Sequence, residues 1–398
     1  MKKLWAVVLA ATLLQACAAQ PERRFNLDWN GIQGGFERTG ALPDAPRPPL
    51  KQKWVFETEG RLVYPPAVFQ GQVYLGSRDS QMYALRLEDG SQVWRTDLPQ
   101  GGIFSAPVIW GDAIYAGTWV PYYSVMAWDL SSGTERWATQ TGEMVNRPPW
   151  VLTDALQLYT HRDPAIGDDE AIKVVAAAWD YDTREPRWEQ PLMGIPAVAP
   201  ALAPEAIIYA TDDQRLTVLE RATGKIRWQA ELESVPVSAP LVHGERVMVA
   251  TETGFVYAFE LATGATAWRF QFKGARLSGD LALSGQRLLV PGGQFLYTFD
   301  IQTLEEGWRF RGPPTVLTPA IASPDFVYIG AANKLFYVLD ARQGTVAGMY
   351  RLGGEILAAP VAAEGLVLVA ASDGKLYAFE EQVLQPNPAQ QPQRPSRW

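Results

Sequence analysis

The stretch APLVHGERVMVATETGFVYAFELATGATAW, residues 239–268, holds three apolar runs and a final tryptophan, separated by short polar turns that contain glycine. Short apolar runs bounded by such turn residues predict antiparallel strands joined by tight hairpins. The apolar residues do not follow a helical period. We therefore expect a meander of four strands, in which the first strand follows Pro240 and the fourth contains Trp268.

The same unit recurs along the chain, with consecutive tryptophans 40 to 51 residues apart. These candidate blade-packing residues are Trp54, Trp94, Trp137, Trp188, Trp228, Trp268 and Trp308, and Tyr350 takes the next place. Four strands per unit at this period, with an aromatic residue in the fourth, are typical of the blades of a β-propeller. A tryptophan suits the wedge between two blades, because its large flat side chain buries much apolar area there.

The number of units predicts how the ring closes. Eight units have the first three strands, and the sixth carries Asp280 where the others have proline. Seven are followed by their own aromatic strand, whereas the eighth, residues 358–380, is not. Trp54-Val55-Phe56 forms a fourth strand with no unit before it. We therefore expect an all-β, eight-bladed propeller of near-identical blades over residues 53–384, closed by the N-terminal strand, which completes the last blade and removes its exposed edge.

Both ends of the chain differ from the repeats. Met1-Lys2-Lys3 and the apolar run after it predict a signal peptide over residues 1–16. The sequence Leu14-Gln15-Ala16-Cys17 resembles a bacterial lipobox, which implies that Cys17 becomes the acylated (palmitate-bearing) first residue of the mature protein. An ordinary secretory signal with a chance cysteine is the alternative. Residues 17–52 are then expected to be the lipidated cysteine and a proline-rich tether, and residues 385–398 a disordered Pro/Gln tail.

Composition excludes several functions. The net charge of −8 leaves no electrostatic footprint for nucleic acid. A single cysteine and two histidines exclude a disulfide scaffold and a Cys/His metal cluster. No nucleophile motif and no phosphate-binding loop is present. We therefore expect no catalytic residue, no metal and no cofactor.

The units Ala67-to-Trp94 and Ala239-to-Trp268 resemble the quinoprotein-type repeat of pyrroloquinoline-quinone-like propellers. Trp29 and Arg38-Thr39-Gly40 resemble the lead-in that precedes such propellers. Together with the lipobox and eight repeats, the chain resembles the BamB family of lipoprotein subunits of the outer-membrane β-barrel assembly machinery. That resemblance implies protein partners in the envelope, no catalysis, and a propeller in the periplasm anchored to the outer membrane. The outer face of the cytoplasmic membrane is the alternative location.

Two other functions remain open at this point. A quinoprotein-like oxidoreductase would share the blade, although the chain is shorter than such enzymes and lacks their pair of adjacent cysteines. A small-ligand module, for a sugar or a peptide, would use the central channel.

Candidate partner-binding residues lie between the second and third strands of two neighbouring blades. Second-to-third connections share one face of a propeller, so we expect these segments to lie side by side. Aromatic residues of this kind are enriched in binding hot spots. The candidates are Trp119, Tyr122 and Tyr123 in the first segment, and His161, Asp168 and Asp169 in the second. Packing between the two segments, and an ordinary solvated acidic loop, are the alternatives.

Candidate channel-lining residues come from the positions just before each first strand. They are Tyr64, Ser105, Arg147 and Asp280. Arg147 is the only charge at the position two residues before the proline place, and Asp280 lies across the expected ring. The sequence therefore suggests a charged pair at the channel, serving either a small polar ligand or the structure alone.

Overall fold

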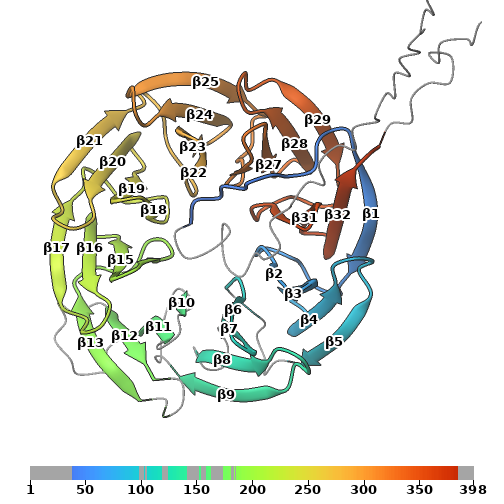
Figure 1. Ribbon diagram of the computed structural model, residues 1–398, viewed down its shortest axis with the longest axis horizontal. Helices are drawn as coiled ribbons and strands as arrows, with labels where there is room; N and C mark the ends of the chain where they lie inside the picture. Colours follow the sequence, from blue (N-terminus) through green and yellow to red (C-terminus); the bar gives the residue numbers. More distant parts are fainter. Residues whose placement is uncertain are drawn as a thin grey trace, which may run out of the picture.

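The computed structural model describes residues 38–97, 103, 105–118, 124–140, 152–153, 158–162, 174–180, 183 and 185–383. Within these ranges the chain forms short strands and no helix, in eight four-stranded antiparallel sheets. The sheets stand around a central axis, with first strands innermost and fourth strands at the rim (Figure 1). The fold is therefore an all-β propeller.

Seven blades are each built from one continuous stretch of chain. Blade 1 comprises β2 (Ala67–Phe69), β3 (Gln72–Gly76), β4 (Gln81–Arg86) and β5 (Gln92–Asp97); blade 2 comprises β6 (Val108–Trp110), β7 (Ala113–Thr118), β8 (Ser124–Asp129) and β9 (Glu135–Gln140); blade 3 comprises β10 (Leu152–Thr153), β11 (Leu158–Arg162), β12 (Val174–Trp179) and β13 (Pro186–Leu192); blade 4 comprises β14 (Ala201–Ala203), β15 (Ala206–Thr211), β16 (Arg215–Glu220) and β17 (Ile226–Glu231). Blade 5 comprises β18 (Leu241–His243), β19 (Arg246–Ala250), β20 (Phe255–Glu260) and β21 (Thr266–Gln271); blade 6 comprises β22 (Ala282–Ser284), β23 (Arg287–Gly292), β24 (Phe295–Asp300) and β25 (Glu305–Arg311); blade 7 comprises β26 (Ile321–Ala322), β27 (Phe326–Gly330), β28 (Leu335–Asp340) and β29 (Val346–Arg351).

The remaining sheet, here the closing blade, joins the two ends of the folded region. It consists of β30 (Val361–Ala363), β31 (Leu366–Ala370), β32 (Lys375–Glu381) and, at the rim, β1 (Leu50–Glu57). β1 runs antiparallel to β32, and Trp54 is paired with Ala378. This pairing confirms the predicted closure of the ring by the N-terminal strand.

The expectation of eight near-identical blades needs a correction. Seven sheets, counting the closing blade, follow one regular plan, and blade 3 departs from it. Its β10–β11 connection, residues 154–157, and its β11–β12 connection, residues 163–173, are longer than their counterparts 244–245 and 251–254 in blade 5. Side-chain environments in blade 3 are described only for β12 and β13. The cause is visible in the chain, because most of the extra residues between Trp137 and Trp188 lie in these two connections.

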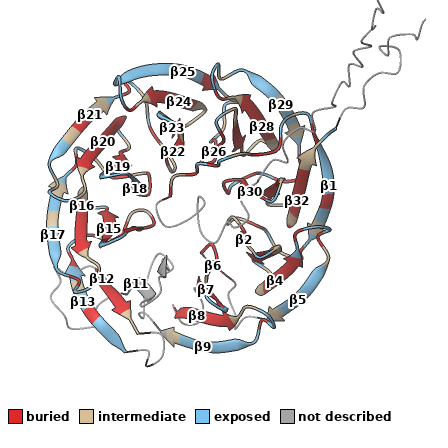
Figure 2. Ribbon diagram, viewed as in Figure 1, coloured by how far each residue is buried: buried red, intermediate tan, exposed pale blue. Residues whose placement is uncertain are grey.

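Where burial is described, the core consists of the inner three strands of a blade. Figure 2 shows these strands as largely buried and the fourth strands as largely exposed at the rim. The patterns follow the sequence: β19 and β20 of blade 5 are apolar and buried, while β21 alternates between covered and exposed positions. Trp54, one of the predicted wedge residues, is 7% exposed and packs in the cluster that joins the closing blade to blade 1.

Two faces of the ring differ in their connections. We call the loop face the one that carries the connections between second and third strands, and the turn face the one that carries the first-to-second and third-to-fourth turns. Because the strands of a blade alternate in direction, these two sets of connections lie at opposite ends of the strands.

Among the described residues, no helix is long and apolar enough to cross a membrane.

Candidate functional site

The predicted partner-binding residues belong to the loop face of blades 2 and 3. Gly117 and Thr118 end β7 and Ser124 begins β8, so the connection between them is residues 119–123. His161 lies in β11, opposite Ala176 of β12, rather than in the connection that follows. Trp119, Tyr122, Tyr123, Asp168 and Asp169 lie outside the described residues.

The predicted channel positions that are described have their polar groups engaged within the blades. Ser105 is buried, and its Oγ accepts a hydrogen bond from the Gly117 backbone N–H at 2.8 Å. Equivalent bonds run from Ala250 N–H to Ser238 Oγ at 2.8 Å, and from Gly330 N–H to Thr318 Oγ1 at 3.0 Å. These hydroxyls therefore tie the segments just before the first strands to the second strands, which is a structural role.

Tyr64 precedes blade 1 and is partly buried. Burial raises the pKa of its phenol, and the neighbouring Arg78 acts in the opposite direction. The phenol therefore stays neutral, as a hydrogen-bonding group rather than a charge.

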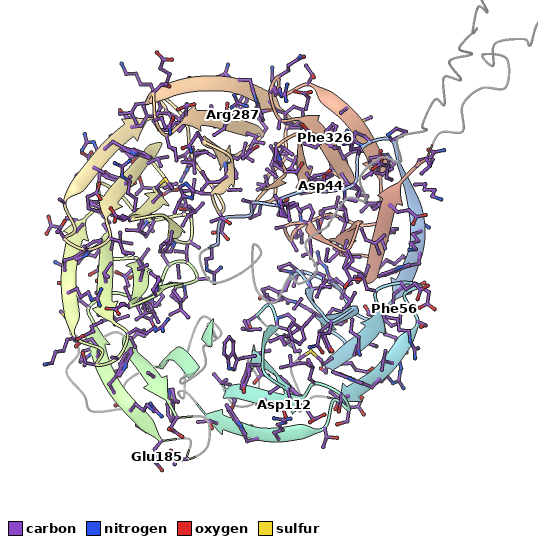
Figure 3. The ribbon with its side chains drawn as sticks, viewed as in Figure 1. Asp44, Phe56, Asp112, Glu185, Arg287 and Phe326 are labelled. Carbon is purple, nitrogen blue, oxygen red and sulfur yellow. The ribbon has the colours of Figure 1, made fainter. Side chains whose placement is uncertain are left out.

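The N-terminal segment before β1 crosses the ring, and we call residues 38–49 the strap. Figure 1 shows it running from the rim beside β1 toward the centre, and Figure 3 labels Asp44 on its course across blade 7. Ala41 forms a parallel bridge with Ala322, and the Leu42 N–H donates to the Ala322 carbonyl at 2.7 Å. These residues fall in the segment where the sequence suggested a tether.

Gly40 allows the strap to approach the inner strands closely. It has a φ of +58°, and a Cβ there would lie 2.9 Å from Cβ of Ala282 in β22 and 3.1 Å from the Ala320 carbonyl oxygen. Next to it, the Leu283 N–H of β22 donates to the Thr39 carbonyl at 2.8 Å. The strap is therefore bonded to the first strands of blades 6 and 7.

At the inner end of the strap, Arg38 enters the ring. Its side chain is only 3% exposed, and its Nε donates to the Pro200 carbonyl in front of blade 4 at 2.7 Å. Its Nη1 has no hydrogen-bond partner among the described residues. One arginine thus links the strap on blades 6 and 7 to blade 4.

Asp280 interacts electrostatically with Arg38. Its Oδ1 accepts a hydrogen bond from the Ala239 N–H of the preceding blade at 2.6 Å. Burial raises the pKa of the Asp280 carboxyl, while the positive charge of Arg38 lowers it. Burial lowers the pKa of Arg38 to about 10, against the opposing effect of Asp280. Arg38 therefore remains charged at neutral pH and offsets the buried carboxylate.

Sequence reasoning paired Asp280 with Arg147, which lies outside the described residues, and it missed Arg38. Arg38-Thr39-Gly40 stood out as a lead-in motif, but no spacing in the sequence links residue 38 to a residue 242 positions later. The signal available in the sequence was Gly40, because a glycine, which has no Cβ, permits the close approach to other strands that the strap makes.

The described channel positions do not fit a quinone with its metal. Such a site needs several carboxylate and amide oxygens together. Of the predicted channel residues that the structure describes, only Asp280 supplies a carboxylate, and that group already accepts a backbone hydrogen bond. In the described part of the chain, no group of three or more His, Cys, Asp or Glu residues is placed to hold a metal ion.

Comparison with known proteins gives a match along the folded region. A sequence model of the family described as "Outer membrane protein assembly factor BamB" matches residues 49–176, 168–309, 252–346 and 305–384. The outer membrane protein assembly factor BamB of Yersinia pestis is 40% identical over 60 residues, which is 15% of this chain and 15% of that protein. The pairwise match therefore spans far less than two thirds of that relative.

Solved structures share the fold at low sequence identity. BamB from Moraxella catarrhalis has a TM-score of 0.66 and 17% identity, over 85% of this chain and 99% of that one. Quinohemoprotein alcohol dehydrogenase from Comamonas testosteroni has a TM-score of 0.74 and 13% identity, over 90% of this chain and 82% of that one. At these identities the likeness shows the fold alone.

Proposed function

Because the chain belongs to the family described as outer membrane protein assembly factor BamB, we propose that it is a non-catalytic propeller scaffold that binds protein partners during the assembly of outer-membrane β-barrel proteins. The observation that carries this proposal is the family match, which runs from residue 49 to residue 384 and so spans every blade. The closed ring supports it, because a rigid propeller presents loops from several blades on one face.

The proposal includes an anchor on the outer membrane, with the propeller in the periplasm. Its support is the lipobox-like sequence that ends at Cys17, the only cysteine of the chain. Residues 1–37 lie outside the described residues. Replacing Cys17 by serine should move the protein from the membrane fraction to the soluble fraction while leaving its folded β signal in circular dichroism unchanged. Retention of the Cys17→Ser variant in the outer-membrane fraction would refute the lipid anchor.

We place the partner-binding surface on the loop face of blades 2 and 3. Its support is the position of residues 119–123 and 163–173, which connect second to third strands in two neighbouring blades. Trp119, Tyr122 and Tyr123 would be the apolar anchors, and His161, Asp168 and Asp169 the polar surroundings. Buried aromatic anchors within a polar rim are the usual composition of an interface hot spot.

A co-purification experiment tests this surface. The triple variant Trp119→Ala, Tyr122→Ala, Tyr123→Ala should lose components of the β-barrel assembly machinery that copurify with the parent protein. Met349→Ala is the matched control, because Met349 is a 58% exposed apolar residue on the rim of blade 7. If the parent protein recovers no such component, the scaffold function is wrong; if the triple variant recovers as much as the control, only the location of the surface is wrong.

The oxidoreductase alternative has no specific observation in its favour. The quinohemoprotein neighbour shares 13% identity, which carries the fold and not the activity. Addition of pyrroloquinoline quinone and calcium, followed by a dye-linked assay with alcohols and sugars, should give no turnover above the protein-free rate.

A further inference from the structure

The seam between blades 5 and 6 lacks a hydrogen bond that is present at five other seams. At five seams, the indole Nε1 of the wedge tryptophan donates to a backbone carbonyl of the next blade. These bonds are Trp54 to Leu87 at 2.9 Å, Trp94 to Leu130 at 3.2 Å, Trp188 to Arg221 at 2.9 Å, Trp228 to Leu261 at 2.9 Å and Trp308 to Ala341 at 2.9 Å. Trp268 is 8% exposed, and its Nε1 is buried without a hydrogen-bond partner. By the repeat, its acceptor would be the carbonyl of Ile301.

The turn between the third and fourth strands explains this difference. In five blades the turn carries a glycine with φ near +70°, and a Cβ there would lie within 2.3–2.6 Å of the tryptophan ring of the preceding blade. These glycines are Gly90, Gly133, Gly224, Gly264 and Gly344. Blade 6 has Leu304 at this position, with φ +59°. A leucine side chain stands where the regular seam has no room for a Cβ, so the ring of Trp268 cannot take the regular position.

A cavity of about 300 Å³ lies at this seam. Its lining includes Trp268, Ile301, Met248, Gln302, Arg246 and Glu260. Gln302 belongs to the β24–β25 turn, and other lining residues come from the β18–β19 turn, so the cavity opens on the turn face. It is therefore on the opposite side of the ring from the proposed partner-binding surface.

The chemistry of the lining selects a neutral, amide-bearing group with an apolar side chain. Arg246 Nε already faces Glu260 Oε1 at 3.1 Å, and a second carboxylate, Glu245, also lines the cavity, so the lining disfavours an anionic group. The indole N–H is a donor only and needs an acceptor. Ile301 and Met248 supply apolar wall, and Gln302 supplies amide hydrogen-bonding groups. A buried donor beside apolar walls is typical of a site that fixes a ligand by one polar contact.

We propose that the blade 5–6 seam binds a short peptide segment of a partner protein, whose backbone carbonyl accepts the Trp268 indole N–H and whose apolar side chain packs on Ile301 and Met248. The cavity volume is at the lower end for small-molecule sites, which suits one residue with its flanking peptide groups. This site is independent of the function proposed for the loop face. The site exists because Leu304 stands where five other blades have glycine. This leucine strains the turn and removes the seam hydrogen bond.

Nuclear magnetic resonance of the indole groups tests the site directly. The mature chain, labelled with ¹⁵N-tryptophan, is titrated with N-acetyl-leucine amide, and the Trp268 signal is identified as the one missing in Trp268→Phe. We expect a saturable downfield shift of that signal while the Trp228 signal, from a regular seam, does not move. A Trp268 signal that stays in place throughout the titration would overturn the proposal.

Two variants at position 304 decide whether the seam geometry creates the site. Leu304→Gly should let Trp268 donate to the Ile301 carbonyl and weaken binding of N-acetyl-leucine amide at least tenfold. Leu304→Ala is the matched control, because it keeps a Cβ against the indole and should keep the site. Unfolding in urea should show Leu304→Gly to be no less stable than the parent, which separates closure from misfolding. Undiminished binding to Leu304→Gly would refute the proposed origin and position of the site.

Discussion

Placing a Cβ at Gly264 should reproduce in a regular seam the disturbance that Leu304 causes in blade 6. Gly264 has φ +74°, and its added Cβ would lie 2.6 Å from Cδ2 of Trp228. In Gly264→Ala the indole must move, and its 2.9 Å hydrogen bond to the Leu261 carbonyl is lost. Gly244 in the same blade is the matched control, because it has φ +59° and nothing lies within 4 Å of its added Cβ.

The two variants share one cost and differ in another. A non-glycine residue in the left-handed region costs about 1–2 kcal/mol of stability, and this applies to both positions. Only Gly264→Ala adds the loss of a hydrogen bond, worth about 1 kcal/mol, together with the repacking of a tryptophan. We therefore expect Gly264→Ala to be less stable than Gly244→Ala by about 1–3 kcal/mol.

Urea unfolding followed by far-ultraviolet circular dichroism measures this difference without depending on the disturbed tryptophan. The ¹⁵N indole spectrum of Gly264→Ala should in addition show a shifted Trp228 signal, whereas Gly244→Ala should leave it in place. Equal unfolding free energies for the two variants would mean that the glycine does not hold the wedge tryptophan in position. The explanation given for the blade 5–6 seam would then also fail.

Three further predictions concern the strap and the inner strands. Arg38→Met should destabilise the protein more at pH 7 than at pH 4. Burial already raises the pKa of Asp280, and this pKa rises further without Arg38, so ionisation of Asp280 costs stability as the pH increases through that range. Urea unfolding at both pH values measures this difference, and a double variant with Asp280→Asn should lose the pH dependence. Gly40→Val should lift the strap from β22, and faster tryptic cleavage of the N-terminal segment should follow; unchanged cleavage would contradict the close approach. Ser238→Ala leaves the buried Ala250 N–H without its acceptor and should lower the unfolding free energy by about 1–3 kcal/mol, whereas a loss below the error of the urea measurement would show that this bond does not stabilise blade 5.

Much of this fold could be predicted from the chain because its information is local and repeated. The tryptophan period, the turn glycines and the proline-started strands each specify one blade without long-range knowledge, and the unpaired strand at Trp54 predicted the closure that β1 and β32 make. Blade 3 was harder, since an insertion lengthens its connections while leaving the period of the next tryptophans intact.

The candidate sites depend on contacts between residues far apart in the sequence, and the repeat period gives no information about these contacts. Asp280 was recognised because it interrupts a row of prolines, but its neighbour Arg38 comes from a segment outside the repeats. The seam at Trp268 was visible in principle, because Leu304 replaces a glycine in an otherwise regular turn. Its effect on an indole in the preceding blade follows only from the spatial proximity of that turn and that ring.

The pairing of β1 with β32 also has a consequence for biosynthesis. The first strand of the folded region leaves the ribosome early, and the strand that it bonds to is among the last to be made. Until β32 is available, β1 offers an unpaired edge to any other strand nearby. The ring can therefore be completed only after translation has passed residue 381, and a chain that stops short of β32 would keep both of its sheet edges open.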